Sequence, residues 1–246
     1  IAPTRFLPNP HAILPPNAVP KSPPRCIAID GPVAAGKSAV GAALARKLGY
    51  RLVDTGMMYR AVTRLALERN IDPRDEPALG ALARDARMTL EAGPPDAPEA
   101  TRIRVDGLDV TDELRLPDVG MAVSLVSRVP AVREEMVAHQ RRLAETGAVV
   151  MMGRDIGTVV LPDAPLKVYL DASPEERARR RYEELRAAGR ETTLERERDE
   201  IAHRDAIDSE RAVSPLRPAD DAVVIDTNGL SLDEVVERVL ALVSCS

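Results

Sequence analysis

A loop near the N-terminus carries residues whose types and spacing suit phosphate binding. The run Gly31-Pro32-Val33-Ala34-Ala35-Gly36-Lys37-Ser38 has two glycines separated by four residues and followed directly by Lys and Ser. Successive backbone N–H groups in such a loop point inward and surround phosphate oxygens, and the following helix adds its positive end. Lys37 would then reach the outer phosphates, and the Ser38 hydroxyl would hold Mg²⁺. The loop predicts a site for a nucleoside triphosphate.

A chance match to this pattern in a Gly- and Ala-rich segment is the simplest alternative. The chain contains 30 Arg but only four Lys, so its basic positions are usually Arg. Lys37 departs from that usage where a compact point charge suits phosphate better than a planar guanidinium group. A β-branched strand before the loop and a helix after it complete the context that the pattern requires, so we favour the phosphate site.

Two more groups of polar residues directly follow expected strands. Asp54-Thr55-Gly56, with Arg60 shortly after, suits a polar substrate that bears a phosphate, although Asp-Thr-Gly is also an ordinary start of a helix. In Gly153-Arg154-Asp155-Ile156-Gly157-Thr158, an Arg and an Asp lie between glycines that let the backbone approach a ligand. Packing does not explain that placement, and ligands of α/β proteins bind at the carboxyl ends of strands. We expect the second group to be functional.

A third group consists of Arg204, Asp208 and Arg211, which are spaced to share one face of a helix. An exposed row of ion pairs, worth a few tenths of a kcal/mol per pair, is the alternative to a binding surface. On the residues alone, the row of ion pairs is the simpler interpretation.

Strands and helices alternate along the chain from residue 26 onward. The expected strands, several of them continuous apolar runs, are Ile27–Asp30, Arg51–Asp54, Val149–Gly153, Lys167–Asp171 and Ala222–Asp226. The expected helices include Ser38–Leu48, Met57–Glu68, Val132–Thr146 and Leu232–Leu242. This alternation predicts an α/β fold with a doubly wound, five-stranded parallel sheet that binds ligands at its strand ends.

Two stretches interrupt the alternation. Residues 86–115 contain short alternating runs around Asp106-Gly107, together with a Gly-Pro-Pro turn, and predict a small antiparallel insert. In the highly charged stretch Ser173–Arg217, Ser173-Pro174 begins a helix, Gly189 ends it, and Thr192-Thr193 begins another. A solvated helical hairpin is the alternative to a mobile lid whose arginines close on phosphates, and the phosphate-binding loop favours the lid.

The bulk properties exclude several classes of protein. A net charge of −5 and only five aromatic residues give no attraction to nucleic acid and no surface for base stacking. No apolar run approaches the ~18 residues of a membrane helix. Two cysteines form no disulfide framework, and the three His are too scattered to bind a metal together. We expect a cytoplasmic monomer that binds neither nucleic acid nor a membrane.

Taken together, the motifs resemble those of the bacterial cytidylate kinases, a family of nucleoside monophosphate kinases, over essentially all of residues 26–243. The matching segments are Ile29-Asp30-Gly31-Pro32, Asp54-Thr55-Gly56 with Tyr59-Arg60, Gly153 to Val160, Pro162-Asp163-Ala164-Pro165, Asp171-Ala172-Ser173 with Glu175-Glu176-Arg177, and Arg211 to Leu216. The insert at 86–115 also matches the extended monophosphate-binding region of this family. We therefore expect a single P-loop kinase domain over 26–246, after a flexible Pro-rich arm at 1–25. Its parts would be a core (26–54, 148–172 and 212–246), a monophosphate-binding region (55–147) and a lid (173–211).

The resemblance implies transfer of the γ-phosphoryl group of ATP, bound with Mg²⁺, to CMP or dCMP in pyrimidine nucleotide metabolism. Catalysis would involve Lys37, Arg154 and Arg181. ATP would be held by the loop Gly31, Pro32, Val33, Ala34, Ala35, Gly36, Lys37, Ser38 and Ala39, and by the lid arginines Arg177 and Arg181. The acceptor's phosphate end would be held by Thr55, Arg60, Arg154, Arg204 and Arg211, beside Asp54. Asp208 would contact the ribose, and Ser124, Arg133 and Asp155 would contact the base.

The implied base contacts make chemical sense for cytosine. Ser124 and Asp155 accept hydrogen bonds from the N4 amino group, while Arg133 donates to N3 and O2. Uracil would present a carbonyl to those acceptors and be rejected. The loop departs from many relatives in Val33-Ala34-Ala35 and in Ala39, which leaves Ser38 as the Mg²⁺ hydroxyl. UMP, AMP or shikimate as acceptor is the nearest alternative. A GTP-dependent switch is disfavoured because the chain has no Asn-Lys-x-Asp sequence.

Overall fold

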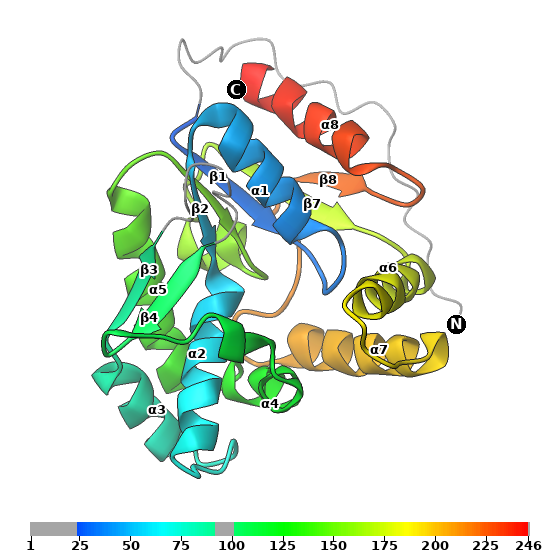
Figure 1. Cartoon of the computed structure of the whole chain (residues 1–246). Helices are drawn as coiled ribbons and strands as arrows, with labels where there is room; N and C mark the ends of the chain where they lie inside the picture. The colour runs from blue at the N-terminus through cyan, green and yellow to red at the C-terminus, as the bar shows by residue number, and fades with distance from the viewer. Residues whose placement is uncertain (1–23, 92–100, 246) are drawn as a thin grey trace, which may run out of the picture.

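The computed structural model of the chain describes residues 24–91 and 101–245, and at its centre is a five-stranded parallel sheet in the order β2-β6-β1-β7-β8 (Figure 1). The strands are β1 (Cys26–Asp30), β2 (Arg51–Asp54), β6 (Val149–Met152), β7 (Leu166–Asp171) and β8 (Val223–Asp226). Every expected strand is confirmed, and each end differs by at most one residue. The P-loop strand β1 is central, between β6 and β7.

Helices cover both faces of this sheet, as the doubly wound arrangement requires. On one face, α1 (Lys37–Leu48) and α8 (Leu232–Cys245) pack on Ile27 and Ile29 of β1. On the other face, α5 (Pro130–Glu145) packs near Ala28 of the same strand. Because successive residues of a strand point to opposite faces, a strand covered on both sides must be apolar throughout. All of β6 is accordingly buried.

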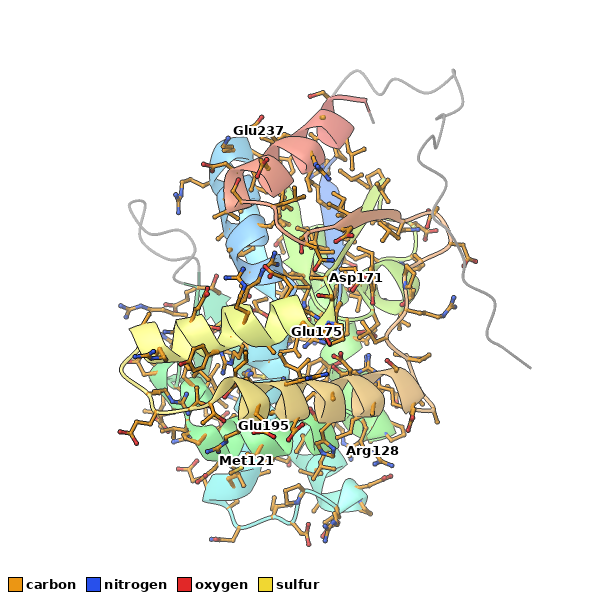
Figure 2. The ribbon with its side chains drawn as sticks, turned by 90° about the vertical axis from the view of Figure 1, so that its right-hand side faces the viewer. Met121, Arg128, Asp171, Glu175, Glu195 and Glu237 are labelled. Carbon is orange, nitrogen blue, oxygen red and sulfur yellow. The ribbon has the colours of Figure 1, made fainter. Side chains whose placement is uncertain are left out.

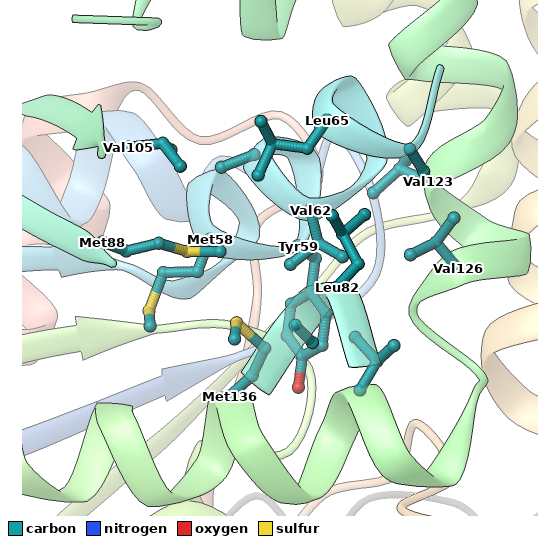
Figure 3. Close-up of a cluster of buried hydrophobic side chains, with 14 of the residues drawn as sticks. Met58, Tyr59, Val62, Leu65, Leu82, Met88, Val105, Val123, Val126 and Met136 are labelled. Carbon is teal, nitrogen blue, oxygen red and sulfur yellow. The ribbon is translucent and has the colours of Figure 1, made fainter. Parts of the chain in front are cut away.

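A second hydrophobic core lies beyond the carboxyl end of β2, among four helices. They are α2 (Thr55–Glu68), α3 (Glu76–Asp85), α4 (Pro117–Val126) and α5, and the sequence did not predict α3 or α4. Figure 3 shows Met58, Tyr59 and Val62 of α2 facing Met136 of α5. This core fixes α2 and α5 relative to each other, and both helices carry candidate site residues.

The insert is a three-stranded antiparallel sheet, as expected, of β3 (Met88–Glu91), β4 (Arg102–Val105) and β5 (Leu108–Asp109). Asp106 and Gly107 join β4 to β5 with φ angles of 51° and 85°, which is the left-handed backbone of a tight hairpin. A short 3₁₀ helix, η1 (Asp112–Arg115), follows. The predicted Gly-Pro-Pro turn lies outside the described residues, as does almost all of the predicted N-terminal arm.

The predicted helical hairpin consists of α6 (Pro174–Ala187) and α7 (Leu194–Glu210), which lie side by side (Figure 2). The Ser173 hydroxyl accepts a hydrogen bond from the Glu176 N–H, and the Thr193 hydroxyl accepts one from the Arg196 N–H. Both helices therefore begin where the sequence predicted. Gly189, with φ of 71°, lies just beyond the end of α6. Within the described residues, no helix is both long enough and apolar enough to span a membrane.

A π-helical turn, η2 (Ile156–Val160), follows β6 and was not predicted. The N–H of Val160 bonds to the Asp155 carbonyl at 3.1 Å, and that of Leu161 bonds to the Ile156 carbonyl at 2.7 Å. Such turns are uncommon and often occur at functional sites. This one directly follows Arg154 and Asp155.

Candidate active site

The loop between β1 and α1 has the backbone shape of a phosphate cradle. Gly31 has φ of 147°, and a Cβ there would lie 2.1 Å from the Leu170 carbonyl oxygen, so a larger residue does not fit. Gly36, with φ of 93°, closes the loop just before α1. Lys37 is buried and donates a hydrogen bond to the Pro32 carbonyl across the loop. Burial, followed by the nearby charge of Arg154, lowers the pKa of Lys37.

The described residues contain no group of three or more acidic, His or Cys side chains that could hold a metal ion. Mg²⁺ commonly binds through substrate phosphates with few protein ligands. Ser38 is exposed at the first turn of α1, beside the cradle. Its hydroxyl is thus open to a ligand in the cradle.

Asp54 and Thr55 join the ends of two neighbouring strands. The Asp54 carboxylate caps α2 by accepting from the Gly56 N–H at 2.9 Å, and burial raises its pKa. The Thr55 hydroxyl donates to the Met152 carbonyl of β6 at 2.9 Å. A Cβ on Gly153 would lie 2.6 Å from that hydroxyl, so only glycine allows this close approach. Asp54 and Thr55, which the sequence predicted as substrate ligands, thus also hold the backbone of the site.

Four arginines from three separate segments lie within electrostatic range of one another. They are Arg60 on α2, Arg154 after β6, and Arg181 and Arg204 on the hairpin. Burial, with the charges of Arg154 and Arg60, lowers the pKa of Arg204 to about 10. Burial, opposed by Asp54 but reinforced by Arg181 and Arg154, lowers the pKa of Arg60. Partly buried like charges repel, so a bound anion would stabilise this arrangement.

A second group surrounds the buried carboxylate of Asp155. Arg133 of α5 forms an ion pair with it and lies over the Tyr59 ring, 5.3 Å from the ring centre. A nitrogen of Arg211 lies 3.8 Å from the other Asp155 oxygen. The Tyr59 hydroxyl is buried, and burial raises its pKa to about 12. The sequence grouped Arg211 with the phosphate ligands, but the structure brings it to Asp155.

Asp208 lies between these two groups. It accepts a hydrogen bond from Arg154 at 2.9 Å, and it is close enough to Arg211 for that charge to act on it. Burial acts to raise the pKa of Asp208, but these two arginines outweigh it and lower the pKa. The face of α7 that carried Arg204, Asp208 and Arg211 is therefore turned toward the site. The exposed row of ion pairs is not what the structure shows.

Ser124 is buried on α4, one turn before Ser127. The Ser127 carbonyl accepts a hydrogen bond from Arg133 at 3.0 Å, and the Ser127 hydroxyl donates to the Ser124 carbonyl. The end of α4 therefore lies beside the Arg133 guanidinium group, which places all three predicted base contacts around one region.

The two lid arginines assigned to ATP occupy different environments. Arg177 is buried and donates to the Val33 carbonyl of the loop at 3.3 Å and to Asp205 of α7 at 2.6 Å. Arg181 pairs with Glu184 and remains partly exposed. Arg177 therefore ties the loop to the hairpin, whereas Arg181 belongs to the arginine cluster.

Sequence reasoning missed a cavity of about 190 Å³ beside the phosphate loop. Arg180 of α6 lines it and donates to both the hydroxyl and the carbonyl of Thr227, at 3.0 and 2.6 Å. The remaining lining comes from Ala35, Gly36, Ala39, Val40, Leu230, Ser231, Leu232 and Val235. No motif marks residues 227–235, and only their position after β8, at the sheet's ligand-binding edge, could have drawn attention to them.

The chain resembles known proteins along most of its length. A family model of cytidylate kinases matches residues 27–245. A cytidylate kinase of Geobacillus kaustophilus (strain HTA426) is 55% identical over 218 residues, covering 89% of this chain and 96% of that protein. One of Geobacillus thermodenitrificans (strain NG80-2) is 53% identical over 219 residues, covering 89% and 96%. A solved gluconokinase from Sinorhizobium meliloti 1021 shares 16% identity at a TM-score of 0.47, covering 91% of this chain and 94% of that one. A likeness of that strength carries no further conclusion.

Proposed function

The chain belongs to the cytidylate kinase family, and from this premise we propose that it transfers the γ-phosphoryl group of ATP to CMP and dCMP. The observation that carries the proposal is the order of the charged groups in the acceptor half. The arginine cluster, the Asp208 carboxylate and the Asp155–Arg133–Arg211 group follow one another. A nucleoside monophosphate has its phosphate, sugar and base in the same order.

The γ-phosphoryl group needs little covalent chemistry from the protein. The acceptor oxygen belongs to a phosphate that is already ionised at neutral pH, so no strong general base is required. Lys37 and the loop N–H groups hold the donor phosphates. The acceptor phosphate is held by Arg60, Arg154 and Arg204. Arg181 faces both phosphates. Mg²⁺, bound with ATP and the Ser38 hydroxyl, would neutralise charge on the donor phosphates. The helical hairpin excludes water, which would otherwise take the phosphoryl group.

Asp155 supplies the preference for cytosine. Its carboxylate is held between Arg133 and Arg211 and can accept from the N4 amino group. The arginines donate to N3 and O2, and Tyr59 lies against Arg133. Uracil would bring a carbonyl oxygen toward a carboxylate, leaving both without a donor. We place Arg211 with the base because one of its nitrogens lies 3.8 Å from an Asp155 oxygen.

The cavity lined by Arg180 suits the adenine and ribose of ATP. It adjoins Ala35 and Gly36 of the phosphate loop, and its walls are largely apolar with Thr227 and Ser231 at hand. A guanidinium group stacks favourably on a planar base. The phosphate loop and this cavity thus form one continuous donor site.

A coupled ADP-release assay across CMP, dCMP, UMP, AMP and shikimate tests the proposal. We expect turnover with CMP and dCMP, much weaker turnover with UMP, and background rates with AMP and shikimate. ADP release that is independent of any acceptor would instead indicate an ATPase or a switch. A preference for AMP or shikimate would overturn the assignment of Asp155.

A further inference from the structure

The π-helical turn Ile156–Val160 is held at both of its ends by charged side chains from elsewhere in the fold. At its start, the two oxygens of Asp30 accept from the N–H groups of Ile156 and Gly157 at 2.8 and 2.7 Å. At its end, Arg141 of α5 donates to the carbonyls of Val160 and Val159 at 3.0 and 2.7 Å. A carboxylate at the N–H end and a guanidinium group at the carbonyl end both match the dipole of the turn.

We propose that Asp30 and Arg141 are positioning residues that fix Arg154 and Asp155 through this turn. Neither side chain belongs to the donor or acceptor groups described above. Arg154 and Asp155 have no regular element of their own, because β6 ends at Met152 and the turn begins at Ile156. Their orientation is therefore set by the backbone on either side. The inference rests on the proposed function, because CMP is the ligand whose binding it explains.

The other contacts of the turn are apolar packing, which does not determine the orientation of its backbone. Ile156 and Val160 are buried in the apolar cluster under the sheet. Apolar contacts tolerate small rotations, whereas hydrogen bonds between charged groups and backbone do not. At Gly157, a Cβ would lie 3.1 Å from the Lys167 chain and 3.4 Å from the Asp30 carboxylate, so the backbone approaches Asp30 closely.

Asp30 also connects the two substrate halves of the molecule. It is the last residue of β1, directly before Gly31 of the phosphate loop, while its carboxylate holds the segment that carries the acceptor ligands. A change at Asp30 would therefore disturb both sites. Arg141 holds the same turn from the opposite end and is exposed on α5, away from the phosphate loop. Replacement of Arg141 therefore distinguishes a positioning role from a general effect on folding.

The decisive variants are Arg141→Ala, Arg141→Lys and Arg142→Ala. Arg142 is the matched control, since it is the next residue on the same helix, is also exposed and carries the same charge. Calorimetric Kd values for CMP alone and for ATP alone, with steady-state KM values and melting temperatures, are the readouts. Loss of two charge-assisted bonds to the turn is expected to weaken CMP binding about tenfold in Arg141→Ala, while Kd for ATP changes less than about twofold.

Arg141→Lys is expected to recover part of the CMP affinity, because an ammonium group still donates to one carbonyl. Arg142→Ala should match the unmodified protein. Asp30→Asn, which can no longer accept from both N–H groups, should weaken CMP binding as well. If Arg141→Ala lowers only the melting temperature, or weakens ATP and CMP binding equally, the positioning role is wrong while the proposed function stands. If the unmodified protein fails to phosphorylate CMP, the proposed function is wrong and the positioning role falls with it.

Discussion

At the scale of single residues, the site contains many buried charged side chains, and some of them are held by backbone groups. Lys37 and Asp30 lie at opposite ends of the phosphate loop, and both are buried. Each bonds to backbone groups: Lys37 to the Pro32 carbonyl, and Asp30 to two N–H groups. Burial and fixed hydrogen bonds hold a charge in place before the substrate arrives, which is how electrostatic catalysis avoids reorganisation.

Replacement of Lys37 by Met should lower kcat with CMP by about 100-fold or more, because the donor phosphates lose their fixed positive charge. The melting temperature should change little, since a Met side chain fills a similar volume and removes a buried charge. Steady-state kinetics and calorimetry on the same preparation check both expectations. Near-normal turnover would show that the loop does not bind the donor phosphates as described.

Asp30 should make stability depend on pH in an unusual direction. Burial raises its pKa from the ordinary 3.8 to about 6. Between these values the folded chain binds more protons than the unfolded chain, so this group favours folding more as the pH falls. Its ionisation costs up to about 3 kcal/mol of stability above pH 6. Lys37 and Asp155 also face the carboxyl group.

Urea unfolding of the unmodified protein and Asp30→Asn between pH 4 and 7.5 isolates this effect, because Asn does not titrate. The free energy of unfolding of the unmodified protein should rise, relative to the variant, as the pH is lowered. A difference that is constant across the range would mean that Asp30 has an ordinary pKa.

At the scale of elements, the hairpin α6–α7 is attached to the phosphate loop through one buried side chain. Arg177 contacts the Val33 carbonyl, the Ala172 carbonyl and Asp205 together. A movement of the hairpin would therefore act directly on the phosphate loop. Many kinases close such a segment over the substrates before transfer.

Arg177→Gln should raise KM for ATP about tenfold through loss of a buried charge-assisted bond network, with KM for CMP almost unchanged. Arg179→Gln is the matched control on the same helix, since Arg179 is exposed and pairs with Glu176 and Glu183 of that helix. Initial-rate measurements with each substrate varied in turn give both constants. Equal effects of the two variants would show that charge on the hairpin matters and that the Arg177 contacts do not.

The sequence predicted the elements whose periodicity and caps are local. The apolar runs of the sheet, Ser173 and Thr193 at the helix starts, and the Asp106-Gly107 hairpin were all confirmed. It did not predict η2, whose backbone bonds to Asp30 and Arg141, two residues that are distant from it in sequence. The spacing of the charges alone favoured an exposed α7 face, because spacing does not distinguish charges turned to solvent from charges turned toward a site, and only the family resemblance assigned that face to the site. Whether individual residues bind CMP or ATP stays a prediction.

At the scale of the whole molecule, hydrophobic clusters on both faces of the sheet and among the helices beyond it support the candidate site. One cluster lies between the sheet and the helices α1 and α8, a second lies on the other face of the sheet around Ile156 and Val160, and a third lies among α2, α3, α4 and α5. The acceptor half concentrates partly buried arginines that repel one another. A nucleoside monophosphate that bridges this half should therefore stabilise the fold measurably.

CMP at one hundred times its Kd should raise the free energy of unfolding by about 2.7 kcal/mol, which follows from binding to the folded state alone. UMP at the same concentration should raise it less, because Asp155 disfavours the uracil carbonyl. Calorimetric melting curves with each nucleotide check this. Equal stabilisation by both would mean that affinity comes from the phosphate and sugar only.

The placement of the tyrosines has a spectroscopic consequence. The chain has four Tyr and no Trp. Tyr59 lies against Arg133 in the acceptor group, Tyr169 is in β7 of the central sheet, and Tyr182 lies beside Arg186 on the hairpin. The acceptor group, the central sheet and the hairpin thus each contain a tyrosine, and no Trp contributes to the fluorescence. Ring-selective isotope labels or a single introduced Trp would follow acceptor binding and hairpin motion as separate signals in the same molecule.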